Sequence, residues 1–132
     1  MYSKFSKLAS ILAFVIGAMA IFAGGQVLLG RVPTYYVIDW LPIYNFTVGA
    51  ITFFYTAIVI WRDGRYAVPA AGATLALHSA VMAILLTVYR DVVAGDSLVA
   101  MTVRIVVWVM ILTLLLIQSR KTRTIKGREQ NV

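Results

Sequence analysis

Four apolar runs dominate the pattern of the chain, at residues 8–29, 42–61, 67–89 and 98–117. Each run is close to the ~20 residues that an α-helix needs to cross a ~30 Å hydrocarbon layer. A backbone in lipid must satisfy its own hydrogen bonds, which favours helices over irregular structure. The pattern therefore predicts an all-α fold, an integral membrane four-helix bundle. We expect a single transmembrane domain over residues 1–132, with a basic tail at 118–132.

Composition agrees with a membrane protein and narrows the chemistry. The chain is 61% hydrophobic and 13% charged, with a mean hydropathy of +0.88. It has no cysteine, which excludes thiolate metal sites and iron–sulfur clusters. With one histidine and five acidic residues, a metal site is hard to build, and we predict none. No self-contained catalytic constellation is visible, so the sequence leans away from an enzyme without deciding the question.

The positive charges predict how the bundle is oriented. Nine of the twelve basic residues fall before the first run, between the second and third, or after the fourth. Two, Arg31 and Arg90, fall on the opposite side, and Arg104 lies within the fourth run. By the positive-inside rule we expect both termini to be cytoplasmic, in the cytoplasmic (inner) membrane. The net charge of +7 then reflects topology, and we predict contact with membrane lipids and no nucleic-acid binding.

Two ionisable residues lie inside the runs, where charge is expensive. Arg104 falls about 10 Å below the outer end of the fourth run, at ~1.5 Å per residue. It is interpreted either as a clamp for a carboxylate, phosphate or quinone carbonyl, or as a structural partner of Asp39, Asp91 or Asp96. Trp108, one turn further on, is placed to stack on the guanidinium in either case.

His78 lies near the middle of the third run. It is interpreted as a haem ligand, a quinone contact or a proton relay, or as a neutral imidazole bonded to Asn45, Thr52 or a backbone carbonyl. The cofactors that remain open are thus quinone and haem.

Polar residues on the first two runs complete the candidate site. Asn45, Gly49, Thr52 and Thr56 share one face of the second helix and are expected to point into the bundle. Gln26, near the outer end of the first helix, and Asp39 can lie at a similar level, and Tyr44 with Asn45 is a candidate for the rim of an outer pocket. The candidate ligand-binding residues are Arg104, His78, Asn45, Gln26, Tyr44 and Trp108.

Small residues recur every three or four positions in the first and third runs. The first carries Ala9, Ala13 and Gly17, with Ala20 and Gly24 spaced likewise; the third carries Gly72, Ala76, Ala80 and Ala83. Such spacing lets helix backbones approach closely in a membrane. These two faces are predicted to make tight contacts, either within the bundle or with another subunit.

Part of the chain resembles a known family. The run GAMAIFAGGQVLLG at residues 17–30, the proline after it, Val48-Gly49 in the second run and the alanine-rich third run are similar in order to DoxX-like four-helix membrane proteins. Gln26 stands where that family often has lysine. The resemblance implies a small four-helix bundle, of a kind sometimes associated with quinone-linked oxidoreductases, and no catalytic role is transferred.

Three functions remain open from the sequence. The first is a small integral membrane subunit or accessory protein that packs within a larger cytoplasmic-membrane complex, beside other membrane subunits or as a homo-oligomer. The second is a quinone- or lipid-binding membrane protein with a polar pocket in its outer half. The third is a small oligomeric transporter.

Overall fold

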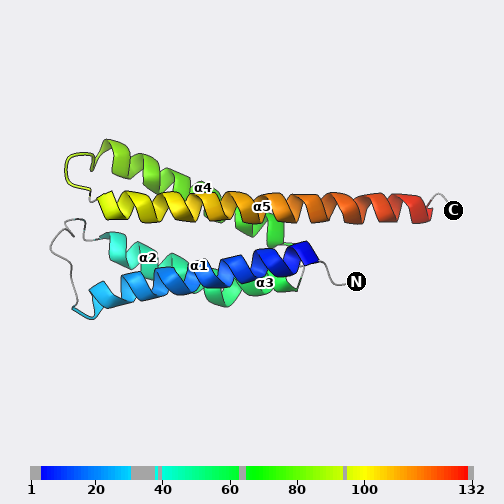
Figure 1. Cartoon of the computed structure of the whole chain (residues 1–132), viewed down its shortest axis with the longest axis horizontal. Helices are drawn as coiled ribbons and strands as arrows, with labels where there is room; N and C mark the ends of the chain where they lie inside the picture. The colour runs from blue at the N-terminus through cyan, green and yellow to red at the C-terminus, as the bar shows by residue number, and fades with distance from the viewer. Residues whose placement is uncertain (1–3, 31–37, 39, 63–64, 94, 131–132) are drawn as a thin grey trace.

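The apolar runs form helices in the computed structural model, which describes residues 4–30, 38, 40–62, 65–93 and 95–130 (Figure 1). The elements in chain order are α1 (Lys4–Leu28), α2 (Trp40–Ile51), the π-helical turn η1 (Thr52–Thr56), α3 (Ala57–Trp61), α4 (Ala67–Thr87) and α5 (Gly95–Gln130). Because α2, η1 and α3 follow one another without a break, the chain has four helical segments. All four are long and apolar enough to cross a membrane.

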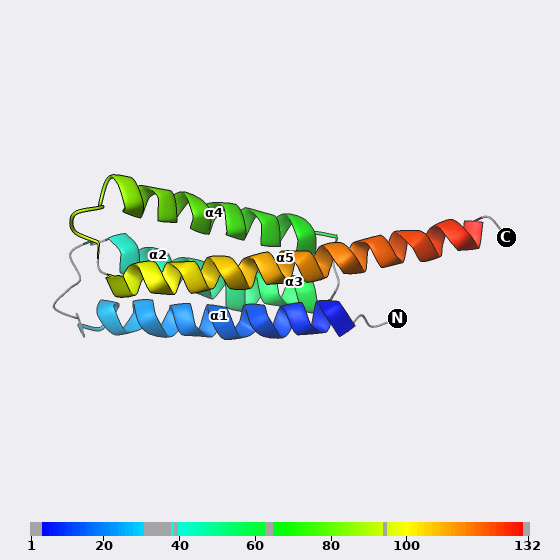
Figure 2. The same ribbon diagram turned by 45° about the horizontal axis from the view of Figure 1, so that its top comes forward.

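The helix boundaries differ from the predicted ones mainly at the C-terminus. The fourth apolar run ends at residue 117, yet α5 continues to Gln130 and projects beyond the other helices (Figure 2). Residues 118–130 contain no proline, and lysine, arginine and glutamine form helices well. Hydropathy detects only the apolar part of a helix, and it therefore did not predict that α5 continues through the polar residues 118–130. The aromatic, amphipathic sequence at residues 30–41 predicts a loop on the outer surface, and Asp63-Gly64 predicts a short turn, but both lie largely outside the described residues.

Helix α1 is central to the packing. It lies along α2, η1 and α3 on one side and along α5 on another, while α4 packs mainly on α5 (Figures 1 and 2). Among the described residues, no Cα atom of α2 comes within 8 Å of one in α4 or α5. The bundle therefore has two close helix pairs, α1 with α2 and α4 with α5, and these pairs are joined by direct packing of α1 on α5 and by the approach of η1 and α3 to α4.

Glycines allow the close approach of α1 to the second helical segment. A Cβ atom on Gly24 would lie 2.6 Å from both the Phe46 nitrogen and the Pro42 carbonyl oxygen. One on Gly49 would lie 2.8 Å from the Ala20 Cβ. The predicted small-residue face of the first helix is thus a tight contact within the bundle, and its partner is α2 with η1.

The small-residue face of α4 is left uncovered by the chain. A Cβ atom on Gly72 would meet no heavy atom within 4 Å, and Ala76, Ala80 and Ala83 are exposed. Large apolar side chains are exposed as well, including Phe22, Phe54 and Val99, each more than 60% accessible. A surface this apolar suits lipid or another membrane-spanning chain.

A polar layer separates two apolar clusters in the interior. One cluster includes Ile38, Leu41, Val81, Leu85 and Met101, and the other includes Ala13, Ile60, Ala71, Trp108 and Ile111. The residues we call the polar layer, Asn45, Thr52, His78 and Arg104, are all buried. On α5, Arg104 falls between Met101 and Trp108, and on α4 His78 falls between Ala71 and Val81. The layer thus crosses the bundle between the clusters.

We expect Gly24→Ala to lower the free energy of unfolding by about 1–3 kcal/mol, because its methyl group would overlap backbone atoms that cannot move away alone. Reversible unfolding in mixed micelles with increasing SDS measures this. Gly25→Ala is the matched control, since its Cβ would meet only the Phe46 ring at 3.7 Å. Equal stability of the two variants would contradict the close packing of α1 on α2.

Candidate functional site

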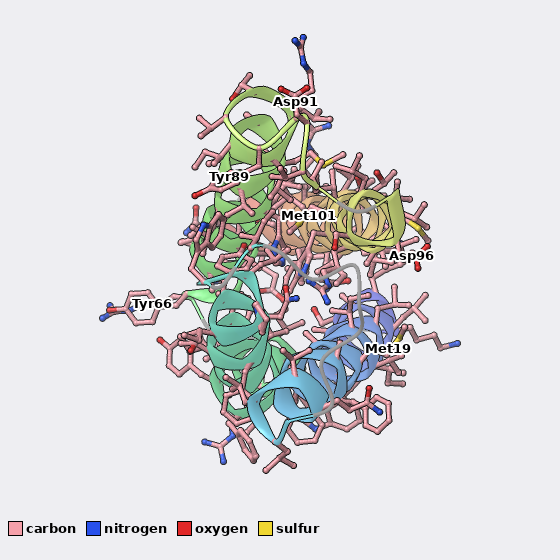
Figure 3. The ribbon with its side chains drawn as sticks, turned by 90° about the vertical axis from the view of Figure 1, so that its left-hand side faces the viewer. Met19, Tyr66, Tyr89, Asp91, Asp96 and Met101 are labelled. Atoms are coloured by element: carbon pink, nitrogen blue, oxygen red, sulfur yellow. The ribbon has the colours of Figure 1, made fainter. Side chains whose placement is uncertain are left out.

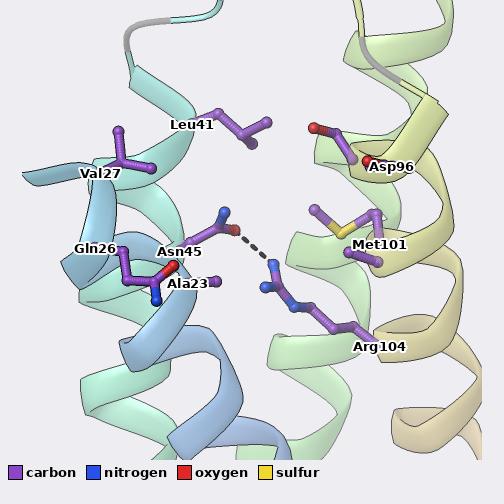
Figure 4. A pocket seen from close by; sticks show the side chains of 10 residues that line it. Ala23, Gln26, Val27, Leu41, Asn45, Asp96, Met101 and Arg104 are labelled. Atoms are coloured by element: carbon purple, nitrogen blue, oxygen red, sulfur yellow. Dashed lines mark hydrogen bonds between the residues drawn. The ribbon is translucent and has the colours of Figure 1, made fainter. Parts of the chain in front are cut away.

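A hydrogen bond between two buried side chains spans the gap between the helix pairs. Nη1 of Arg104, on α5, donates to Oδ1 of Asn45, on α2, at 2.5 Å (Figure 4). Arg104 is 7% exposed and Asn45 5%. The long arginine side chain is needed here because the α2 and α5 backbones lie too far apart to touch. Hydrogen bonds that involve a charged group are about twice as strong as neutral ones, so this one is a firm link between the pairs.

A second polar contact joins α2 to α4. The Tyr44 hydroxyl and Nδ1 of His78 lie 2.7 Å apart and share a hydrogen bond whose donor depends on the histidine tautomer. The sequence favoured Asn45, Thr52 or a backbone carbonyl as the partner of His78. Tyr44 takes that place, because Asn45 is turned toward Arg104. Nearer the ends of the same helices, Trp40 Nε1 donates to the Tyr89 hydroxyl at 3.0 Å.

A cavity of about 170 Å³ lies beside the Arg104–Asn45 bond. It opens toward the end of the bundle where α1 ends and α5 begins, which we call the cavity end. Figure 3 looks onto this end, with Met101 toward the middle of the bundle and Met19, Asp91 and Asp96 toward its edge. Helices α1, α2 and α5 supply the lining: Ala23, Gln26, Val27, Leu41, Asn45, Asp96, Ser97, Ala100, Met101 and Arg104.

Trp108 lies on the other side of the Arg104–Asn45 bond, fully buried. Its ring faces that of His78, with centroids 6.5 Å apart. It also lines a crevice of about 10 Å³, together with small residues of α1 and α2 and members of the polar layer. Trp108 is therefore a core residue, in contact with the polar layer and with the second apolar cluster.

The predicted site residues divide between these two spaces. Gln26 lines the cavity, His78 and Trp108 line the crevice, and Asn45 and Arg104 line both. Tyr44 lines neither space and bonds His78 instead. The predicted inward face of the second helix is confirmed, since Asn45, Gly49, Thr52 and Thr56 are all buried.

Sequence reasoning named Asp96 only as a possible partner of Arg104 and did not place Ser97 in the site, although both lie at the start of α5 and line the cavity. Aspartate and serine at this point of the sequence are typical N-caps, and a residue at a helix start can also face a cavity between helices. Of the acidic partners predicted for Arg104, Asp91 is exposed and Asp39 lies outside the described residues. Asp96 is exposed and shares the cavity with Arg104.

The site is rich in hydrogen-bond donors and contains no evident nucleophile. Arg104, Asn45, Gln26 and Ser97 all carry N–H or O–H groups. Among the described residues, no three His, Cys, Asp or Glu side chains are grouped to hold a metal ion. The arrangement suits binding of a ligand that presents hydrogen-bond acceptors.

Comparison with protein families, curated proteins and solved structures finds no match to the chain. The resemblance to DoxX-like proteins therefore stays a prediction. Function has to be argued from the site itself.

We expect Asn45→Ala to lower the free energy of unfolding by about 2 kcal/mol, because it removes an acceptor from a buried guanidinium. The same SDS unfolding experiment measures the change. Thr47→Ala, at an exposed position two residues along α2, should change stability little. If both variants were equally stable, the bond across the gap would contribute nothing to the fold.

Proposed function

We propose that the chain is an integral membrane protein that binds the polar head group of a quinone or lipid in the cavity. Its four apolar helices would span the cytoplasmic membrane, with both termini cytoplasmic. The nine basic residues would then lie at the cytoplasmic end, and the cavity end would face outward.

The observation that carries this proposal is the position of Arg104. Placing an arginine at the centre of a membrane helix costs about 2.5–3.5 kcal/mol on insertion scales, so such residues usually serve a function. Here the buried guanidinium lines a cavity that also reaches the exposed Asp96 at the start of α5, which would lie near the outer membrane surface in the proposed orientation. In this apolar setting a hydrogen bond from a guanidinium to a ligand oxygen is strong.

The size and charge of the cavity favour a small neutral head group. At about 170 Å³ it is smaller than the ~300–1,000 Å³ of sites that enclose a whole drug-sized ligand. A single ring or a compact head group fits that volume better than an entire lipid. The Asp96 carboxylate lies at the mouth and repels anions, which favours a quinone carbonyl over a phosphate.

A second candidate function rests on the uncovered face of α4. Its alanines are exposed, a Cβ on its glycine would meet no described heavy atom within 4 Å, and these residues are spaced for close helix packing. This favours a role as a subunit whose α4 packs on another membrane-spanning chain. The two functions are compatible, since the cavity lies among α1, α2 and α5.

For ligand binding, we expect Arg104→Gln to weaken binding of a short-chain ubiquinone analogue about 10- to 100-fold, because a charge-assisted hydrogen bond is lost. Calorimetry or equilibrium dialysis in nanodiscs measures this. Arg120→Gln removes the same charge at an exposed position outside the cavity and should bind like the parent chain.

Parallel titration with a short-chain phosphatidylglycerol separates the two ligand classes. Tighter binding of the phospholipid, abolished by Arg104→Gln, would identify a lipid instead of a quinone. If neither ligand binds the folded parent chain, or if both bind Arg104→Gln unchanged, the ligand-binding function is wrong.

For the subunit function, we expect Ala76→Leu with Ala80→Leu to dissociate assemblies that survive extraction in mild detergent, because the added bulk separates the helix backbones. Native mass spectrometry gives the size and composition of the particles. Ala18→Leu adds similar bulk at an exposed position of α1 and should leave them intact. A parent chain that is monomeric after extraction would count against this function.

A further inference from the structure

Trp108, which lines the crevice, carries a buried hydrogen-bond donor that has no partner among the described residues. Trp108 is 0% exposed, and its Nε1–H makes no hydrogen bond to any described residue. Leaving such a group unsatisfied costs about 1–3 kcal/mol, so buried donors are nearly always bonded to protein or to ordered water. An orphaned indole N–H next to an empty space therefore points to something that occupies the space.

The space has the size of one water molecule and cannot close. Its volume of about 10 Å³ is close to the ~10–15 Å³ required for one water on the same scale. One wall is formed by Gly17, Ala20 and Gly49, where the helices are already in contact. A Cβ on Gly17 would lie 3.0 Å from the Phe53 nitrogen, so this wall is fixed by backbone.

The other lining residues supply the acceptors that a water molecule needs for its two protons. The Thr52 hydroxyl oxygen accepts hydrogen bonds, and Oδ1 of Asn45 has a second lone pair besides the one that faces Arg104. Thr52 also begins the π-helical turn η1, in which the Ala57 N–H bonds to the Thr52 carbonyl. Such turns widen a helix locally and are frequent at binding sites.

We propose that the crevice binds one water molecule, which accepts a hydrogen bond from Trp108 Nε1–H and donates to Thr52 Oγ1 and Asn45 Oδ1. The water would be a fixed part of the structure, deep between the two apolar clusters. This inference does not depend on which ligand the cavity binds.

The water site extends the polar path that starts in the cavity. Because Asn45 and Arg104 line both spaces, the hydrogen-bonded groups run from the cavity through Arg104 and Asn45 to the water and Trp108. The His78–Tyr44 pair lies next to the same crevice. A change at Arg104 would thus reach Trp108 through three hydrogen bonds, with Asn45 and the water between them.

Nuclear magnetic resonance of the full chain in nanodiscs, with ¹⁵N-labelled tryptophan, tests the proposal. Trp108→Phe assigns the Trp108 signal among the three indoles of the chain. We expect a cross-peak between the Trp108 indole proton and a long-lived water, and its loss in Thr52→Val, which keeps the shape and removes the acceptor. Thr56→Val is the matched control, because Thr56 is equally buried one turn away and does not line the crevice.

Three results would overturn the proposal. The first is an indole proton with no water contact and the chemical shift of an unbonded donor. The second is a water cross-peak of equal strength in Thr52→Val and in the control Thr56→Val. The third is a signal that shifts on titration with chloride, which would identify an anion in place of water.

The stability of Trp108→Phe provides a measurement that does not need Thr52→Val to fold. Phenylalanine removes the indole N–H and also part of the buried ring volume, so with a bonded N–H both losses make the variant unfold at lower SDS than the parent chain. If the N–H is truly unsatisfied, its removal relieves a penalty and the variant resists SDS better, which would also refute the proposal.

Discussion

The arrangement of the bundle depends on satisfying one charged side chain in an apolar interior. Arg104 must have hydrogen-bond acceptors, and Asn45 provides one from a helix whose backbone is out of reach. The bond therefore links α2 to α5 at a level where their backbones are not in contact. Tyr44 with His78, and Trp40 with Tyr89, span the same gap toward α4. Directional polar contacts thus connect α2 to α5 and to α4. Such contacts specify one spacing and one register of the helices, whereas apolar packing alone would allow several spacings.

The gap itself follows from the glycines of the first two segments. Gly17, Gly24 and Gly49 draw α1 and α2 so close that little side-chain volume remains between them. Helix α2 is thereby held against α1 and away from α4 and α5. The space left over at one end becomes the cavity, and the space left over deeper becomes the crevice that accommodates Trp108. Tight packing at one interface thus creates the openings at another.

Sequence patterns predicted the number of helices and the residues that collect in the interior, because both follow from hydropathy and helical periodicity. They did not predict which polar residues pair. Asn45 and Thr52 are equally plausible partners for His78 on one helix face, and the choice of Tyr44 depends on how far α2 lies from α4. Hydropathy also failed to predict where α5 ends, because the helix continues beyond the apolar run to Gln130. That Asp96 and Ser97 line the cavity follows from the packing of α1 beside α5, which the sequence does not specify.

Because α5 is one uninterrupted helix, it links the interior and the projecting basic segment geometrically. Arg104 faces inward in a fixed rotational register, and Arg120, Lys121, Lys126 and Arg128 follow on the same axis. One residue inserted between them would turn the basic side chains by about 100° relative to Arg104. The rotational register of α5 that directs Arg104 toward Asn45 therefore also determines the directions in which the basic side chains point beyond the bundle.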